Sequence, residues 1–213
     1  MSATEQFYDN ALDASGRISD LEQFREHMEG FLSRERTYFQ EEAHPDLESQ
    51  FLPLFSATFP PILHSSLVVS SVMLIELELR AFADALQKHL SLPLSMSDLQ
   101  GSLLERFRKY AVSLAGLEMS PQDGQWADVV GVFEIRNCLV HNYGSLDRFS
   151  RRAIVEGFAQ RHGVPALEND IIKPDDATSA IVLKIASSFF DIIYEAALHR
   201  FPGPHNWPIR FRS

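Results

Sequence analysis

The chain has 213 residues, of which 45% are hydrophobic and 23% are charged, and it contains sixteen phenylalanines. This composition excludes a globally disordered protein and supplies enough apolar surface for one packed core. The net charge is −10 at pH 7, and residues 1–50 hold twelve acidic against four basic residues. Because an acidic protein approaches a polyanion slowly, this balance argues against a general nucleic-acid binder, although a local basic patch is compatible with it.

The amino terminus and the cysteine content predict an intracellular protein. Residues 1–10 are polar and acidic, unlike the basic start and apolar stretch of a signal peptide, and we expect no later segment to be a long uncharged apolar run. The single cysteine, Cys138, cannot form an internal disulfide or a Cys-based zinc cluster, which fits a reducing cytosol. We therefore expect a cytoplasmic protein without a membrane partner. It should fold as a single domain over residues 1–213, with its core in about residues 16–200.

Helical periodicity predicts two long helices in the first ninety residues. Residues 15–43 contain no proline and repeat apolar side chains at roughly helical spacing, which predicts a first helix. Residues 44–61 contain several prolines and lack a clear period, so we expect a connection there. From Pro60 or Pro61 to Leu90 runs the most apolar stretch of the chain, which predicts the central buried helix.

Cap and stop residues delimit the next two predicted helices. Ser97 and Asp98 are suitable amino-terminal caps for a third helix that ends near Gly116. Residues 121–143 form the fourth predicted helix, and Gly144 follows it as a left-handed stop.

The last third of the chain predicts two further helices. Residues 150–160 have the pattern of a short fifth helix, whereas residues 162–173 fit either a loop or a small two-stranded excursion. The Pro-Asp-Asp start of residues 174–198 indicates the beginning of a final helix, and residues 201–213 should be an extended tail. The fold class is therefore all-α, an up-and-down bundle of about five to six helices.

The fourth predicted helix carries an R-N-x-x-x-H run formed by Arg136, Asn137 and His141. At about 100° per residue, Arg136 projects to the middle of an apolar face, with Cys138 on the opposite side. A guanidinium on such a face must be paired or line a cleft, because burying an unpaired charge is costly. Asn137 and His141 are four residues apart, so they neighbour each other on the flank of that face. A nucleophilic role for Cys138 in the same cleft is not expected.

The central helix offers a partner for this arginine. Glu76 lies within an apolar stripe, and we expect it to pair with Arg136 across the bundle, although Arg80 competes for the same carboxylate. His141 falls in the last turn of its helix, where the macrodipole favours a cation.

Cleavage of RNA by the ribose 2′-hydroxyl requires a base, an acid and a cation for the crowded phosphate. His141 suits the proton transfer and Arg136 the charge, and a two-fold dimer would supply the second proton-transferring group. The alternative left open is a structural ion pair with a capping histidine.

Residues near the run are candidates for contacts with RNA. Arg148, Arg151 and Arg152 follow the run and would form an RNA-facing basic edge, or else an ordinary solvated helix surface. Tyr143 would stack on a base at the rim of the cleft, or else pack against the fold. The remaining histidines lack metal-ligand spacing, and no phosphate-binding glycine loop is visible, so we expect no metal and no cofactor.

Three segments together resemble a known family. The stretch E-I-R-N-C-L-V-H-N-Y-G, residues 134–144, resembles the signature of the HEPN superfamily. The stretch T-F-P-P-I-L-H-S-S-L-V-V-S-S-V-M-L-I-E-L-E-L, residues 58–79, resembles the second helix of bacterial HEPN proteins, with an acid where Glu76 stands. The stretch L-L-E-R-F-R-K-Y-A-V-S-L-A-G-L, residues 103–117, is similar to their following helix. The resemblance spans roughly residues 20–145.

This resemblance implies a helical homodimer with facing motifs and metal-independent endoribonuclease activity of the toxin–antitoxin, abortive-infection or phage-defence type. By the same resemblance Arg136 and His141 would be catalytic, with Asn137 in the site beside them, and an antitoxin or a nucleotidyltransferase would be the partner. Some branches of the family have lost catalysis. The resemblance therefore also implies an alternative, a non-catalytic helical module for dimerisation, nucleotide binding or partner binding.

Overall fold

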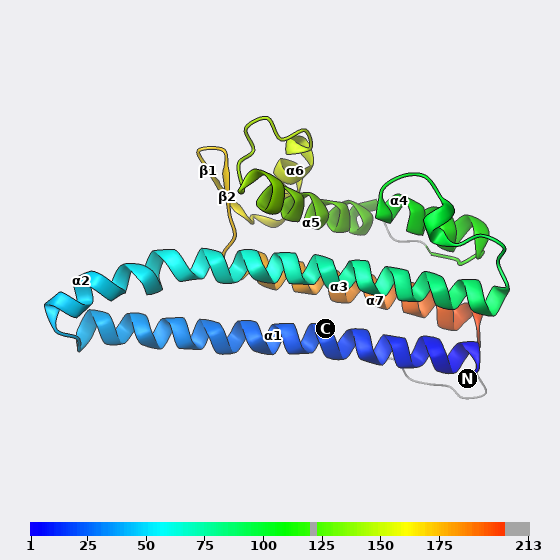
Figure 1. Ribbon diagram of the computed structural model, residues 1–213, viewed down its shortest axis with the longest axis horizontal. Helices are drawn as coiled ribbons and strands as arrows, with labels where there is room; N and C mark the ends of the chain where they lie inside the picture. The colour runs from blue at the N-terminus through cyan, green and yellow to red at the C-terminus, as the bar shows by residue number, and fades with distance from the viewer. Residues whose placement is uncertain (120–122, 203–213) are drawn as a thin grey trace. The chain divides into compact units, whose positions relative to one another are not determined.

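The computed structural model describes residues 1–119 and 123–202, which are predominantly α-helical with one small two-stranded sheet (Figure 1). The predicted all-α helical bundle with a small β excursion is confirmed. The described α-helices are α1 (Ala3–Glu41), α2 (Pro45–Pro53), α3 (Phe59–Leu90), α4 (Leu103–Arg108), α5 (Asp123–Asn142), α6 (Arg152–His162) and α7 (Asp176–Arg200). Shorter elements are the π-helices η1 (Leu54–Thr58) and η3 (Lys109–Leu114), the 3₁₀-helix η2 (Met96–Asp98), and the strands β1 (Ala166–Glu168) and β2 (Ile171–Lys173).

The chain divides into two compact units. Unit 1 draws on Met1–Ile18, Met73–Val130 and Lys184–Ser213, and unit 2 on Ser19–Val72 and Gly131–Leu183. Helices α1, α3, α5 and α7 each contribute residues to both units. The expectation of a single domain over the whole chain stays a prediction.

The first helix begins at Ala3, earlier than the sequence predicted. Phe7, Ala11, Ala14 and Ile18 are all buried, and their spacing of four, three and four residues places them on one helix face. The expected start of the core at about residue 16 is therefore wrong, because the polar residues between these four concealed a short apolar stripe.

The connection predicted for residues 44–61 is also wrong, because these residues form α2, η1 and the start of α3. Pro45 occupies the first turn of α2, where a missing N–H group costs nothing. After Pro53 the chain adopts the wider π-helical turn of η1, and the Ser56 hydroxyl donates to the Leu52 carbonyl over 2.7 Å. A proline disturbs the helical turn that precedes it, and this wider turn directly precedes Pro60 and Pro61, so the chain stays helical past them.

The third predicted helix starts later than expected. Its cap is Ser102, not Ser97 or Asp98: the Ser102 hydroxyl accepts from the Glu105 N–H over 3.3 Å, and the Glu105 carboxylate accepts from the Ser102 N–H over 2.9 Å. This reciprocal capping box fixes the start of α4. The predicted end at Gly116 is confirmed by its left-handed backbone, with φ +66°.

The later elements match the sequence more closely. Of the two options for residues 162–173, the two-stranded one is confirmed, with Leu167 paired to Ile172 in an antiparallel register. The Asp175 carboxylate accepts from the Thr178 N–H over 2.8 Å and caps α7.

Residues 203–213 of the expected tail lie outside the described residues. Phe201, at the start of that tail, stacks on Phe7 with a distance of 5.3 Å between the ring centres and belongs to the packed fold.

Aromatic packing around Phe82 forms the core of unit 1. The Phe82 ring lies 5.1 Å from that of Phe7, 5.7 Å from that of Phe107 and 5.3 Å from that of Tyr194, and all four residues are fully buried. These tilted and edge-on contacts join α1, α3, α4 and α7, and each stabilises the fold by about 0.5–1.5 kcal/mol beyond its buried area.

A charged group is buried beside this core. Glu78 on α3 is 2% exposed, and its carboxylate lies 2.5 Å from the Arg17 guanidinium and accepts from the Tyr194 hydroxyl over 3.0 Å. Burial raises the pKa of Glu78, and the bond from Tyr194 acts in the opposite direction. The hydroxyl of Tyr194 therefore stabilises the carboxylate form in an environment that disfavours it.

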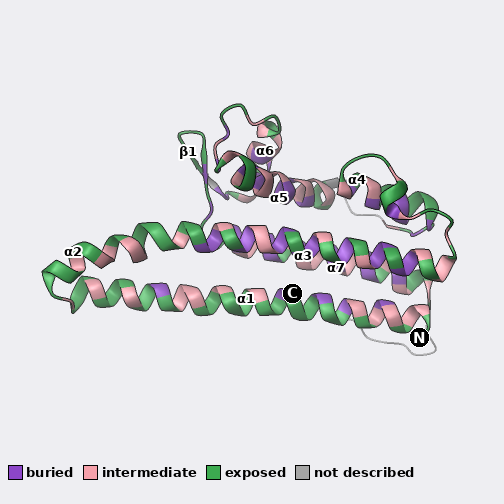
Figure 2. Cartoon of the chain, in the orientation of Figure 1, coloured by how far each residue is buried: buried purple, intermediate pink, exposed green. Residues whose placement is uncertain are grey.

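One helical run, Pro45–Leu90, has the length and apolar composition of a membrane-spanning helix. The expectation that no segment would be a long apolar run is therefore wrong. Of the most apolar window of this run, 56% is buried within the fold, as in the core helix of a soluble protein. Buried residues are correspondingly denser on α3 than on α1 (Figure 2).

We predict that Tyr194→Phe lowers the free energy of unfolding by about 1–3 kcal/mol near neutral pH, because the buried Glu78 carboxylate loses a donor. Burial makes the pKa of Glu78 higher in the folded state than in the unfolded state. Glu78 therefore contributes its full share to stability only below its unfolded-state pKa, and this share is lost as the pH rises through its folded-state pKa. The cost of the substitution should shrink as the pH falls, because the raised pKa of Glu78 favours protonation of the carboxylate that the Tyr194 hydroxyl stabilises. Urea unfolding at about pH 5 and about pH 8 measures the difference.

Tyr110→Phe is the matched control, because the buried Tyr110 hydroxyl donates to the Leu94 carbonyl, which does not titrate. Its cost should be the same at both pH values. An equally constant cost for Tyr194→Phe would contradict the assigned role of Glu78.

Candidate active site at the carboxyl end of α5

The carboxyl end of α5 is closed by two residues with left-handed backbone. Tyr143 has φ +53° and Gly144 has φ +76°, and the Gly144 N–H donates to the Cys138 carbonyl over 3.0 Å. This is the stop that the sequence predicted at Gly144. It turns the chain sharply within one residue of the helix end, so His141 is held in the last turn.

The β-hairpin packs directly on this stop. The Ile172 N–H donates to the Gly144 carbonyl over 2.8 Å, and the Leu146 N–H donates to the Asp170 carbonyl over 2.7 Å. A side chain added at Gly144 would approach the Ile172 carbonyl to 3.3 Å. The end of α5 is therefore bonded through its backbone to the hairpin and has little freedom to move.

Arg136 is held by its neighbours on α5. Its Nη1 donates to the Asn137 Oδ1 over 3.0 Å, and the Asn137 Nδ2 donates in turn to a Glu134 carboxylate oxygen over 3.4 Å. The guanidinium carbon lies 6.0 Å from the centre of the Phe133 ring. Asn137 thus orients the arginine, as expected of the polar residue of the run. Glu134 extends this support, and sequence reasoning missed it because the residue lies within the same short stretch without a pattern of its own.

His141 and Tyr143 face solvent. His141 is exposed, and within the described part of the chain it forms no hydrogen bond or ion pair. Tyr143 is 93% exposed, so its ring is not part of the core. Neither side chain is used for packing. The packing alternative for Tyr143 is therefore wrong, and stacking of its ring on a base stays a prediction.

The predicted position of Arg136 at the centre of a buried face is wrong. Arg136 is half-buried, and Val140, one turn later on the same side, is 47% exposed. Cys138, projected to the opposite side, is fully buried, and its thiol donates to the Ser145 carbonyl over 3.2 Å. The segment after α5 folds back over the Cys138 side, which leaves Arg136 at the margin of the buried face. Helical periodicity within α5 cannot predict that a later segment of the chain packs over one side of this helix.

Cys138 is chemically inert in this position. Burial raises the pKa of its thiol to about 11, so the thiol stays protonated at neutral pH. A protonated, buried thiol agrees with the prediction that Cys138 is not a nucleophile in this site.

Of the three arginines predicted to face RNA, two are exposed and the third is half-buried between two carboxylates. Arg148 and Arg151 are exposed, and Arg148 lies 3.8 Å from the Asp147 carboxylate. Arg152 lies 2.8 Å from the Glu156 carboxylate and 2.7 Å from that of Asp170. Arg152 therefore fixes α6 to the loop of the hairpin, and the basic edge is reduced to the first two arginines.

The expected counter-ion of Arg136 lies on the central helix. Glu76 is half-buried on α3, and Arg80, its expected competitor, is exposed. The pairing of Glu76 with Arg136 stays a prediction.

Comparisons of the chain with protein-family models, with curated proteins and with solved structures find no match. The resemblance to the HEPN superfamily therefore rests on the three sequence segments named above. What it implies about activity and partners enters below as a proposal.

We predict that Gly144→Ala lowers the free energy of unfolding by about 1–3 kcal/mol, because the new side chain forces a strained left-handed backbone. The contact with the Ile172 carbonyl adds to this cost. Chemical denaturation measures it. Gly124→Ala, on the same helix in open space, is the control and should be neutral or stabilising by about 0.5–1 kcal/mol. Equal effects of the two substitutions would show that the stop does not constrain the end of α5.

Proposed function

We propose that this protein is a metal-independent endoribonuclease of the HEPN type, acting in toxin–antitoxin or phage defence, with Arg136, Asn137 and His141 as its active site. The observation that carries the proposal is the pairing of a fixed arginine with an unengaged histidine. Asn137 holds the Arg136 guanidinium at 3.0 Å, while His141 on the next turn is exposed. A purely structural histidine would be expected to cap or pack, and His141 does neither within the described residues.

The chemistry follows from these two side chains. The ribose 2′-oxygen attacks the adjacent phosphorus and forms a P–O2′ bond as the P–O5′ bond breaks. A base takes the proton of the 2′-hydroxyl, and an acid delivers a proton to the departing 5′-oxygen. The products are a 2′,3′-cyclic phosphate and a 5′-hydroxyl. The guanidinium of Arg136 offers N–H donors to the phosphate oxygens, where negative charge accumulates.

A single histidine cannot act as base and acid in the same step. We infer that two copies of the chain associate about a two-fold axis and place two copies of His141 at one phosphate. Exposed apolar side chains near the end of α5 suit such an interface, since Val140 is 47% exposed and Ile171 on β2 is 43% exposed.

The RNA-facing surface would extend from this centre. The Tyr143 ring, 93% exposed beside His141, offers a face on which a base can stack. Arg148 and Arg151 are exposed a few residues later and provide phosphate contacts. Such a protein would act in the cytoplasm. An antitoxin, or a nucleotidyltransferase encoded beside it, would control its activity.

We predict that the purified protein cleaves single-stranded RNA in the presence of EDTA and that His141→Ala reduces the rate by about 10²–10⁴-fold, as for loss of a general acid–base group. A gel assay with end-labelled RNA measures both. His199→Ala is the matched control, because His199 is also an exposed histidine in the last turn of a helix. It should cleave like the wild type. Equally inert wild-type and His141→Ala dimers on varied RNA would refute the nuclease.

The second candidate is a non-catalytic helical module for dimerisation, nucleotide binding or partner binding. The exposed apolar residues Val140, Tyr143 and Ile171 favour it, because a binding surface requires them without requiring His141. The two candidate functions differ in the role of His141. Replacing His141 alone would abolish RNA cleavage by a nuclease but would leave binding by a non-catalytic module unchanged.

We predict that Val140→Asp converts the dimer to a monomer and abolishes RNA cleavage, because an aspartate at the interface is desolvated without a partner. Size-exclusion chromatography with light scattering reports the mass. Val112→Asp is the control, since Val112 is 38% exposed on η3, and it should remain a dimer. A dimeric and active Val140→Asp protein would place the interface elsewhere.

A further inference from the structure

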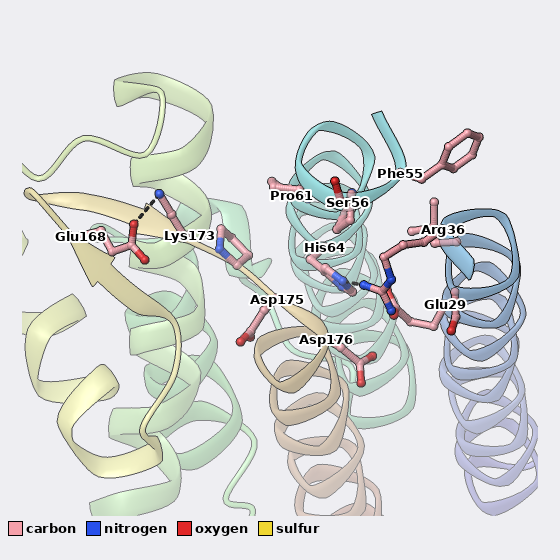
Figure 3. A pocket seen from close by; sticks show the side chains of 14 residues that line it. Glu29, Arg36, Phe55, Ser56, Pro61, His64, Glu168, Lys173, Asp175 and Asp176 are labelled. Carbon is pink, nitrogen blue, oxygen red and sulfur yellow. Dashed lines mark hydrogen bonds and ion pairs between the residues drawn. The ribbon is translucent and has the colours of Figure 1, made fainter. Parts of the chain in front are cut away.

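Unit 2 contains a pocket at the start of α7, separate from the residues of the proposed nuclease. The cavity has a volume of about 400 Å³ and is lined by residues of α1, η1, α3, the β-hairpin and the start of α7 (Figure 3). Three of these residues, Glu29, His64 and Asp176, present ligand atoms that all lie within 4.8 Å of one another. They belong to three different helices, α1, α3 and α7.

The tautomer of His64 is fixed by its neighbour Ser179. The Ser179 hydroxyl donates its single proton to the Asp176 carbonyl over 3.0 Å, so toward the ring it can only accept. The His64 Nδ1, at 3.1 Å from that hydroxyl, must therefore carry the N–H. In the neutral ring the other nitrogen, Nε2, then presents a lone pair. A carboxylate, carbonyl or hydroxyl that accepts from the second N–H is the usual support of a metal-binding histidine.

The Nε2 of His64 lies beside a carboxylate oxygen. His64 has only 3% of its side chain exposed, and its Nε2 lies 2.9 Å from the Glu29 Oε1. This oxygen is buried, and among the described residues it has no hydrogen-bond partner, because the two atoms are not aligned as N–H···O. With the ring neutral, this nitrogen and the carboxylate oxygen would repel each other at 2.9 Å. Either a second proton on the ring or a metal cation bound to both atoms removes that repulsion.

Asp176 supplies a third oxygen and is itself held in place. The Arg25 guanidinium pairs with the Oδ1 of Asp176, and a carboxylate oxygen of Asp176 lies within 4.8 Å of the ligand atoms of Glu29 and His64. Figure 3 shows Asp176 at the first turn of α7, below His64. The charge of the site also favours a cation, because the four carboxylates of Glu29, Glu168, Asp175 and Asp176 outnumber the three basic groups of Arg36, Lys173 and the Asp176 partner Arg25.

We propose that Glu29, His64 and Asp176 bind a divalent transition-metal ion, with Zn²⁺ as the best match. One imidazole nitrogen and two carboxylate oxygens form a mixed set that suits Zn²⁺ better than Mg²⁺ or Ca²⁺, which take oxygen ligands. With metal–ligand bonds of about 2.0–2.2 Å, neighbouring ligand atoms lie about 3–3.5 Å apart. The 2.9 Å separation of Nε2 and Oε1 is close to this value. Three protein ligands leave a fourth position open to the cavity.

This site is independent of the nuclease, since it shares no residue with Arg136, Asn137 or His141. No sequence pattern indicates this site, because its ligands stand at positions 29, 64 and 176 and only the packing of three helices brings them together. The expectation of no metal rested on histidine spacing along the chain. Bound metal would tie α1, α3 and the start of α7 to one another.

The test uses untagged full-length protein, stripped of metal and then dialysed against Zn²⁺. We expect about one Zn²⁺ per chain by elemental analysis. We also expect a melting temperature raised by on the order of 5 °C when free Zn²⁺ is about 100-fold above its Kd. Glu29→Gln and Asp176→Asn should each weaken Zn²⁺ binding by about tenfold or more, as measured by isothermal titration calorimetry. Mg²⁺ should bind much more weakly than Zn²⁺.

Glu168→Gln is the matched control, because Glu168 lines the same pocket and pairs with Lys173 but is not among the three ligands. It removes the same charge and should bind Zn²⁺ like the wild type. Circular dichroism of the metal-free variants verifies folding, and Asp176→Asn alone decides the outcome if Glu29→Gln does not fold, since Asp176 is half-exposed. Absence of Zn²⁺ binding by the folded wild type would overturn the proposal. Unchanged binding by Asp176→Asn would do the same.

Discussion

The left-handed turn at Tyr143–Gly144 is the constraint on which the end of α5 and the β-hairpin depend. It ends α5 one residue after the helical segment that carries Arg136, Asn137 and His141, and its carbonyl receives the Ile172 N–H of the hairpin. The second strand of that hairpin ends at Lys173, directly before the Asp175 cap of α7. One backbone conformation therefore fixes the proposed nuclease residues and also connects them to the segment that supplies Asp176.

The sequence predicted what local chemistry determines. The central helix, the Gly144 stop and the Pro-Asp-Asp start of α7 follow from periodicity and from caps, which act over a few residues. The predictions that were wrong depended on partners distant in the chain. Proline-rich residues 44–61 remain helical through a π-turn, and Arg136 lies at the margin of its buried face because the segment beyond Gly144 covers the Cys138 side. The pocket of Glu29, His64 and Asp176 depends on three helices and has no signature in the sequence.

The two proposed sites represent different uses of a histidine. His141 is exposed and has no partner among the described residues, which suits a group that must exchange protons with a substrate. His64 has 3% of its side chain exposed, and Ser179 fixes its tautomer, which suits a metal ligand. Both arrangements occur in one acidic protein, whose net charge of −10 favours cations generally and makes RNA binding depend on the local arginines near α5.

Because a metal-activated water and a ribose hydroxyl cut RNA differently, the ends of the cleaved RNA test the central claim most directly. Attack by the 2′-hydroxyl leaves a 2′,3′-cyclic phosphate and a 5′-hydroxyl, whereas attack by a metal-bound water leaves one fragment with a terminal phosphate monoester and the other with a hydroxyl. Mass spectrometry of the fragments distinguishes these products. The Arg136–His141 site predicts cyclic phosphate ends, produced equally with and without EDTA. Terminal phosphate monoesters without any cyclic intermediate, formed only with metal, would contradict it.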